Sequence, residues 1–550
     1  MFPADLRLTM FSRILRILRP SHEHTAFSAT VLLMAAIMLS RVIGYVREAY
    51  IAYAFGAGGL TDAYVAAFTL PDWLNYILAG GTASITFISI YTRFLAEERE
   101  AEAQKTFSVI VTVMTAVFLV GIAIAEIVTP QFVHWMFPGF TGAKVELTIS
   151  LTRILLPAQL FFYVGGVVSA VLLSRRLFLL PALGPLVYNA CIIFGGVLLG
   201  RRIGIASLAW GAVLGCVLGP FLINAIGAAR VGTGYRISFA IRNPAFREWV
   251  RLSIPLMLGV SLVTADDWIL RYFASGDVGA ISRLNFAKRL FAVPMAVLGQ
   301  ATGQASLPFF AKLFSEKRLK EFGETVNAAV YRISALSFLS AAWMIAAALP
   351  LIDLVYRRGR FSFGDAQETA VYFLWFSMSL AFWAAQGLYA RGFYAAGDTL
   401  TPMVACTIVT VLSLWVYRGL FHALSVTGLA IASDLGIVAN TVVAAVLLNR
   451  KKLVALSAFP WKELSKAVLV AAVAGVFSFE VARLIPLRGS RLADLESLSL
   501  VTVTWAGGVA AGLWLLGSDL PRALRRRKAQ PSAGVVSKPV EDVAGAGMEP

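Results

Sequence analysis

Charged side chains inside long apolar segments are the residues of this sequence that could do chemistry. Arg41, Arg47 and Glu48 lie in the first such segment, and the eighth contains Lys288 and Arg289. An ionisable side chain near the centre of a bilayer costs about 2.5–3.5 kcal/mol on insertion scales, so it usually faces a cavity or a partner. A guanidinium group is planar, always charged and able to bind two phosphate oxygens at once. Two or three arginines directed into one cavity would therefore suit a phosphate-bearing substrate, whereas a cavity for cationic drugs would be rich in carboxylates.

The placement of the first two arginines leaves a second interpretation open. Arg41 and Arg47 are six residues apart, about 600° of helix rotation, so they point to different faces of a straight helix unless Gly44 permits a bend. Arg47 could also form a structural ion pair with Glu48 or with an acid on a neighbouring segment. Arg41 has no acid within one turn, so a purely structural role fits it less well.

Polar side chains also occur in two later segments, each among the first two segments of its repeat. Asn75 lies in the second apolar segment, and Asp266 and Asp267 lie in the seventh, four or five residues before Arg271. Carboxylates inside a membrane pair with cations or line a cavity. We therefore expect Asp266 and Asp267 to form ion pairs or to belong to a site.

The composition indicates that lipid surrounds most of the chain. Of its 550 residues, 58% are hydrophobic and 14% charged, with a mean hydropathy of +0.75, whereas soluble domains carry about 25% charged residues. The net charge of +17 could indicate nucleic-acid binding. The basic residues lie between apolar segments rather than in one stripe, which is typical of the cytoplasmic loops of membrane proteins. We predict a multi-pass protein of the inner (cytoplasmic) membrane that binds no nucleic acid.

A membrane-spanning helix needs about 20 mostly apolar residues, and about fourteen segments meet this condition. They lie at 28–53, 62–91, 106–127, 147–173, 178–199, 203–228, 247–273, 283–310, 325–350, 367–391, 401–421, 425–448, 464–485 and 497–517. The fifth and sixth would be joined by a tight turn at residues 200–202. With the N-terminus cytoplasmic, lysine and arginine concentrate on the cytoplasmic side, so we expect both termini there.

An internal repeat predicts two lobes. Residues 81–85 (GTASI) close the second segment and residues 303–307 (GQASL) close the eighth, and a basic cytoplasmic stretch follows each copy. Parallel repeats of this kind place a substrate site near the midplane, between the lobes. The expected organisation is a basic cytoplasmic segment at 1–27, an N-terminal lobe at 28–230, a C-terminal lobe at 231–455, two further helices at 456–520 and a disordered cytoplasmic tail at 521–550.

The sequence carries no motif of an ATPase, a serine hydrolase or a zinc protease. Cys191, Cys216 and Cys406 stand alone within apolar runs, and the histidines are unpaired, so neither type has the spacing of a metal or disulfide site. We expect a transporter rather than an enzyme, without a cofactor.

Several motifs taken together resemble one known family. Residues 40–48 (SRVIGYVRE) are followed by 55–58 (FGAG), 61–63 (TDA) and 70–71 (LP), then by 285–290 (NFAKRL) with Pro294, and by 392–394 (GFY) with Asp398 and 401–402 (TP). This order resembles the signatures of the MurJ (MviN) family, the lipid II flippases of the MOP exporter superfamily. The resemblance runs from about residue 28 to residue 517.

The resemblance implies an all-α integral membrane protein with about fourteen transmembrane helices. Two six-helix lobes would form a V around a cationic cavity, as in MOP and MATE transporters, and two extra C-terminal helices would add a lipid-facing groove. Matched by motif position, the family's cavity arginines fall on Arg41, Arg47 and Arg289, and Glu48 takes the place of the acid after the second arginine. These four residues would bind the substrate.

The sequence departs from the family at several site positions. A family arginine falls on Asn75, a glutamate falls on Gly80, and an acid after the eighth-helix arginine falls on Ala292. A cation site of the family uses an acid on helix seven, which Asp267 could supply, and an asparagine on helix eleven, which falls near Tyr417. A coupling cation and the exact lipid-linked substrate therefore stay open.

The resemblance implies that the chain moves lipid II, the undecaprenyl-pyrophosphate-linked peptidoglycan precursor, from the cytoplasmic to the periplasmic leaflet by alternating access. Its partners would be lipid II and the membrane lipids. Two alternatives stay open, namely another MOP-type exporter of a polyprenyl-linked glycan or drug, and a membrane scaffold that does not transport. Residues 55–61 and 275–281 are the expected gates at the periplasmic mouth.

Overall fold

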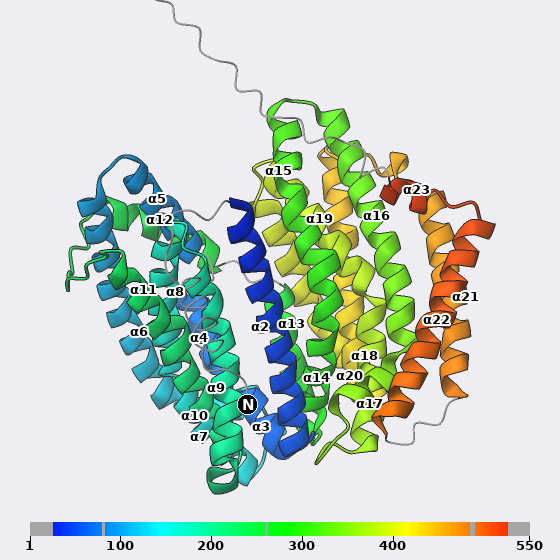
Figure 1. The fold of residues 1–550 in the computed structure, drawn as a ribbon, viewed down its shortest axis with the longest axis horizontal. Helices are drawn as coiled ribbons and strands as arrows, with labels where there is room; N and C mark the ends of the chain where they lie inside the picture. The colour runs from blue at the N-terminus through cyan, green and yellow to red at the C-terminus, as the bar shows by residue number, and fades with distance from the viewer. Residues whose placement is uncertain (1–25, 80–82, 259–261, 485–489, 526–550) are drawn as a thin grey trace, which may run out of the picture.

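The computed structural model describes residues 26–79, 83–258, 262–484 and 490–525, and every regular element in these ranges is a helix (Figure 1). The N-terminal helices are α2 (Ala26–Phe55), α3 (Gly59–Ala67), α4 (Thr69–Ala79), α5 (Ala83–Ala96), α6 (Glu100–Met136), α7 (Ala143–Leu155), α8 (Ala158–Ser174), α9 (Leu179–Ile203), α10 (Ala206–Cys216), η1 (Val217–Ile223) and α11 (Asn224–Arg230).

The C-terminal helices are α12 (Pro244–Leu258), α13 (Leu262–Phe273), η2 (Ala274–Gly276), α14 (Ala280–Pro294), η3 (Met295–Ala301), α15 (Thr302–Ser315), α16 (Leu319–Ala346), α17 (Ala348–Tyr356), α18 (Phe363–Met378), α19 (Leu380–Ala395), α20 (Leu400–Arg450), η4 (Leu456–Ala458), α21 (Trp461–Arg483), α22 (Arg491–Leu515) and α23 (Leu520–Arg525). Most of the expected terminal segments, 1–27 and 521–550, lies outside the described residues.

Eight helical stretches within the described residues are long and apolar enough to cross a membrane, and a ninth is obtained if α18 and α19, bent by 41°, form one span. Other predicted spans are divided into shorter helices. Pro220 lies inside η1 and Pro294 directly precedes η3, so π-helical turns interrupt the sixth and eighth segments. Proline has no backbone N–H and cannot continue the regular hydrogen-bond ladder.

The structure locates two of the turns between predicted spans. The turn predicted at 200–202 is wrong, because α9 continues through these residues to Ile203 and the chain reverses at Gly204, whose φ is +60°. Glycine adopts this left-handed conformation without a side-chain clash. The eleventh and twelfth segments form the single element α20, which is broken at Ser425 by a non-helical φ of 52° and ψ of −140°.

The N-terminal and C-terminal helices form two groups (Figure 1). Helices α4–α12 lie on the left of the view, α13–α20 occupy the centre and right, α2 stands between them, and α21 and α22 form the right edge. Helix α2 packs against α9, while α21 and α22 pack against α16.

The hydrophobic core connects these groups mainly at one end of the molecule. The largest cluster joins Phe137 and Ala63 of the N-terminal group to Leu270, Leu284 and Tyr356 of the C-terminal group. A second cluster is built from α5, α6, α8, α11 and α12, and a third from α15, α16, α19, α20 and α21. The first cluster lies at the end that contains the loop between α2 and α3, which is the end predicted to be periplasmic.

Candidate functional site

Arg47 and Glu48, in the last third of α2, form a buried ion pair. Arg47 donates to the Glu48 carboxylate and, at 2.8 Å, to the side-chain oxygen of Asn189 on α9. Glu48 is only 5% exposed. The pairing that the sequence left as an alternative for Arg47 is therefore present, and it fixes the guanidinium between α2 and α9.

Arg289 of α14 approaches the same carboxylate from the other group of helices. Its Nε lies 3.8 Å from Oε1 of Glu48, and its side chain is 53% exposed. The Tyr45 hydroxyl donates to the backbone carbonyl of Arg289 at 3.4 Å. Glu48 therefore lies between two guanidinium groups, and Arg289 keeps most of its donors available to a ligand.

Arg41 is exposed, and no hydrogen bond or ion pair joins it to another described residue. It precedes Glu48 by seven residues, about 700° of helix rotation, so the two lie nearly on the same face of α2. Tyr45 is on that face as well, and Tyr45 contacts α14. The structure therefore places Arg41 on the same face of α2 as Glu48, whereas Arg47 and Arg289 are the arginines that approach the Glu48 carboxylate.

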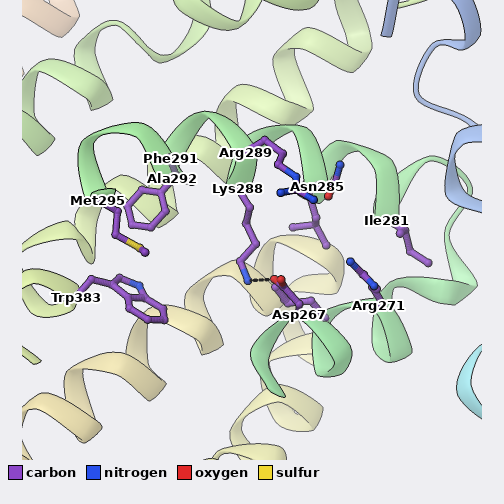
Figure 2. Close-up of a pocket in the computed structure, with 12 residues that line it drawn as sticks. Asp267, Arg271, Ile281, Asn285, Lys288, Arg289, Phe291, Ala292, Met295 and Trp383 are labelled. Atoms are coloured by element: carbon purple, nitrogen blue, oxygen red, sulfur yellow. Dashed lines mark hydrogen bonds and ion pairs between the residues drawn. The ribbon is translucent and has the colours of Figure 1, made fainter. Parts of the chain in front are cut away.

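A cavity of about 160 Å³ opens beside this cluster, between α13, α14 and the start of α19 (Figure 2). Arg289 is one of its lining residues. Figure 2 shows Lys288 extending from α14 to Asp267 on α13, with Arg271 on the same side of the cavity. Ala292, which replaces a family acid, also lines it. The wall is thus richer in cations than in carboxylates.

Asp266 and Asp267 share the ammonium group of Lys288. Lys288 donates to the Asp266 carboxylate and, at 2.5 Å, to Oδ1 of Asp267. Asp266 is 1% exposed and also accepts from the Tyr417 hydroxyl and, at 3.0 Å, from Ser433. The two aspartates are therefore ion-paired, and a cation from solution would have to compete with the lysine.

Asn75 is not in contact with the arginines of α2 and α14. Its amide nitrogen donates to Oε1 of Gln159 on α8 at 2.9 Å, within the N-terminal group. Gly80, the position of the family glutamate, lies outside the described residues. Asn75 therefore stabilises packing between α4 and α8 in this conformation.

The loops predicted to form a gate lie in contact. Asp62 of α3 is fully buried and accepts from the backbone N–H of Gly279 at 2.6 Å, from both donors of Ser282 at 2.9 Å, and from Lys144 of α7 at 2.9 Å. A Cβ placed on Gly139 would lie 2.3 Å from the Cα of Gly276. A side chain at position 139 would therefore collide with the backbone of the other group, so the mouth is tightly shut.

Three of these polar partners were not predicted from the sequence. Lys288 was noted beside Arg289 but not assigned to the site. Arg271 joins the two groups by donating to Thr69 at 2.9 Å, with Asp72 at 3.9 Å. Asn189 holds Arg47. A polar residue within an apolar segment was the available signal, but it does not say which polar residue is the partner.

Comparisons with known proteins show which family the chain matches. The family model described as lipid II flippase MurJ matches residues 51–486. The lipid II flippase MurJ of Burkholderia cenocepacia is 28% identical over 432 residues, which cover 76% of this chain and 82% of the relative. A probable lipid II flippase MurJ of Rickettsia prowazekii is 26% identical over 415 residues, which cover 75% and 81%.

Solved structures show the same fold. A lipid II flippase MurJ in an inward closed conformation superposes with a TM-score of 0.74 at 21% identity, covering 88% of this chain and 99% of that one. An inward-facing MATE multidrug transporter of the MOP superfamily reaches 0.61 at 16% identity, covering 77% and 98%. With its apolar helices, the chain is a multi-pass membrane protein. Because the family model spans residues 51–486 of its 550 residues, the chain belongs to the lipid II flippase MurJ family.

Proposed function

We propose that this protein is a lipid II flippase of the inner membrane, which moves undecaprenyl-pyrophosphate-linked peptidoglycan precursor from the cytoplasmic to the periplasmic leaflet. Membership of the MurJ family supports the substrate class. In this proposal the protein is a transporter and not an enzyme, and its partners are lipid II and the surrounding lipids.

The arrangement of Arg41, Arg47, Glu48 and Arg289 is the observation that carries the proposal. Arg47 and Arg289 share the carboxylate of Glu48, and Arg41 adds a third, unpaired guanidinium on the same face of α2, so the four side chains together carry a net charge of about +2. Arg41 and the exposed Arg289 retain donors that a pyrophosphate could accept in bidentate pairs. A cavity with this charge favours an anionic lipid over a cationic drug.

The proposal includes fourteen transmembrane helices with both termini cytoplasmic. Each predicted segment coincides with one helix or with two or three consecutive shorter helices, and α20 supplies two spans across its break at Ser425. Residues 28–230 and 231–455 form the two lobes, and residues 456–520 the two extra helices. In this orientation the closed end around Asp62 is periplasmic, so the conformation would receive substrate from the cytoplasmic side.

In alternating access, the closed mouth around Asp62 would then open while the opposite mouth closes. Pyrophosphate bound between Arg41 on α2 and Arg289 on α14 would reduce the repulsion between the lobes, and a ligand shifts such a balance only by its differential affinity for the two states. A coupling cation, if the cycle uses one, would first have to displace Lys288 from Asp266 or Asp267.

Complementation tests this function directly. A bacterial strain depleted of its own lipid II flippase should grow when it expresses the wild-type chain and should fail with Arg41→Ala, although the variant reaches the membrane. Arg153→Ala is the matched control, because Arg153 is a half-exposed arginine of α7 that pairs only with α6, and it should support growth.

Each result has a separate meaning. Failure of the wild-type chain despite normal membrane levels would contradict lipid II transport and would favour a different MOP-type exporter or a scaffold. Growth with Arg41→Ala would remove Arg41 from the proposed site while leaving the function intact.

A further inference from the structure

Asp434 is a buried carboxylate that no described residue satisfies. It lies on the second part of α20, within the apolar stretch 425–448, and is 9% exposed. Neither of its side-chain oxygens has a hydrogen-bond partner among the described residues. Buried polar groups are almost always hydrogen-bonded, so this exception needs an explanation.

The groups that face Asp434 come from three neighbouring elements and from α20 itself. Asp266 of α13, Lys288 of α14 and Tyr417 of α20 lie within electrostatic range of Asp434. Ser379, at the bend between α18 and α19, is close enough for its hydroxyl to form a hydrogen bond with Asp434 if the hydroxyl turns toward it. Asp266 brings a negative charge, Lys288 brings the only positive charge among these four, and Ser379 brings a hydroxyl.

The nearby donors are engaged elsewhere. Lys288 donates to Asp266 and Asp267, and Tyr417 donates to Asp266. Ser379 donates its hydrogen to the carbonyl of Phe376 at 2.8 Å. An ionised Asp434 would gain a donor from this set only if Ser379 gave up its hydrogen bond to Phe376.

An ionised Asp434 would be strongly unfavourable in this environment. A buried charge without a partner costs several kcal/mol, and the single ammonium group nearby already serves two carboxylates. A protonated Asp434 carries no charge, and its O–H could be donated to the oxygen of Ser379, whose own hydrogen is used. Binding a proton therefore removes the charge and supplies the hydrogen bond that an ionised Asp434 lacks.

We propose that Asp434 is a proton-binding site, occupied in this conformation, and that its occupancy is linked to the ion pair between Lys288 and Asp266. If Lys288 leaves Asp266, its ammonium group becomes available to an ionised Asp434, and the proton can be released. Motion of α14 relative to α20 would then exchange a proton. The link to transport rests on the proposed function, whereas the proton site itself does not.

Infrared spectroscopy of the purified protein in lipid, without substrate, tests the site. The carbonyl stretch of a protonated carboxylic acid should be present at neutral pH, should decrease at alkaline pH, and should be missing in Asp434→Asn. Asp353→Asn, which changes another fully buried aspartate of the C-terminal helices, is the matched control and should keep the band. A wild-type spectrum without a band that depends on Asp434 would overturn the proposal.

Thermal unfolding gives an independent measurement. The melting temperature of the wild type should fall as the pH rises from neutral to alkaline, because loss of the proton leaves a buried unpaired charge. The melting temperature of Asp434→Asn should fall much less, because its amide cannot ionise. Asparagine imitates the protonated side chain in shape, so the variant is expected to fold. An equal fall in the melting temperature of both proteins would contradict the proton site.

Transport in vesicles tests the link to Lys288. An imposed pH gradient should change the rate of lipid II movement by the wild type and should have no effect on Asp434→Asn. If the infrared band is present and the gradient has no effect on the wild type, the site stands and its coupling to transport is wrong. If neither protein moves lipid II but the band is present, only the proposed function fails.

Discussion

Ser282 donates both its backbone N–H and its hydroxyl to one oxygen of Asp62, each at 2.9 Å. The carboxylate thereby caps the N-terminus of α14 from a helix of the other group, which satisfies donors that a helix leaves unpaired at its first turn. Lys144 supplies the balancing charge at 2.9 Å. The start of α14 and the closed mouth are therefore held by the same side chain.

Asp62→Asn should weaken the closed mouth. The amide keeps the shape but has no charge and one acceptor oxygen fewer, and hydrogen bonds to charged groups contribute about 1.5–3 kcal/mol each. We expect a loss on the order of 2 kcal/mol for the closed state, which is more than tenfold in its population. Labelling of Ala57→Cys by a membrane-impermeant maleimide should become faster.

Thr61→Val is the control for this measurement, because the Thr61 hydroxyl donates only to Gly56 within its own group of helices. It should leave the labelling rate near that of the parent. Unchanged labelling with Asp62→Asn would show that other contacts hold the mouth shut.

Glu48→Gln should lower stability strongly, whereas Arg289→Ala should lower it little and abolish transport. Removing the Glu48 charge leaves Arg47 buried without its partner, which costs about 3–5 kcal/mol in comparable pairs, so the melting temperature should fall sharply. Arg289 is 53% exposed and 3.8 Å from Glu48, so its removal should cost about 0–1 kcal/mol while complementation is lost. Normal growth with Arg289→Ala would exclude it from the substrate site.

A disulfide across the gate should stop transport reversibly. The carbonyl of Ala57 lies beside Gly279, so Ala57→Cys combined with Val278→Cys places two thiols at this contact. The background lacks all three native cysteines. Oxidation should block lipid II movement and reduction should restore it. Transport by the cross-linked protein would rule out opening of this mouth as a step of the cycle.

The contact between α17 and α22 should depend on pH. Asp353 and Asp494 are fully buried side by side, with Arg357 and Arg358 each 3.2 Å from one of them. Burial, and then the hydrogen bond with Asp494, raises the pKa of Asp353 from 3.8 to about 6. The folded protein thus holds the Asp353 proton more tightly than the unfolded chain.

The stability gained from that proton is complete below the unfolded pKa and is lost as the pH rises through the folded pKa. Between about pH 4 and pH 6, wild-type stability should therefore fall with rising pH relative to Asp353→Asn. Thermal unfolding of both proteins across this range checks the sign. A difference that grows with rising pH in favour of the wild type would contradict the assignment.

Topology reporters should separate the two ends of the molecule. Fusions at Glu97 and Arg318 should report the cytoplasm, and fusions at Phe140 and Gly359 should report the periplasm, because Phe140 and Gly359 lie at the closed end. A periplasmic signal at Arg318 would invert the proposed orientation.

The sequence by itself determined the class of protein, the order of its apolar segments and the residue types of the site. Burial in lipid is a local property, so a stretch of about 20 apolar residues reveals a span without knowledge of its neighbours. An arginine such as Arg41 or Arg289 within such a stretch is costly and is therefore visible. The position of the turn at Gly204 was missed because Arg201 and Arg202 were assigned to the turn, although cations are favourable in a last helical turn.

The pairing of charges was decided only by the tertiary structure. Glu48 lies between Arg47 and Arg289, and Lys288 lies between two aspartates. The Glu48–Arg289 contact joins residues 241 positions apart, and no local pattern records the distance between two helices. The same holds for Asp62 and Ser282, whose contact exists only because two groups of helices meet at one end. Apolar patterning fixes which residues enter the membrane, whereas the packing of whole helices fixes which charges neutralise one another.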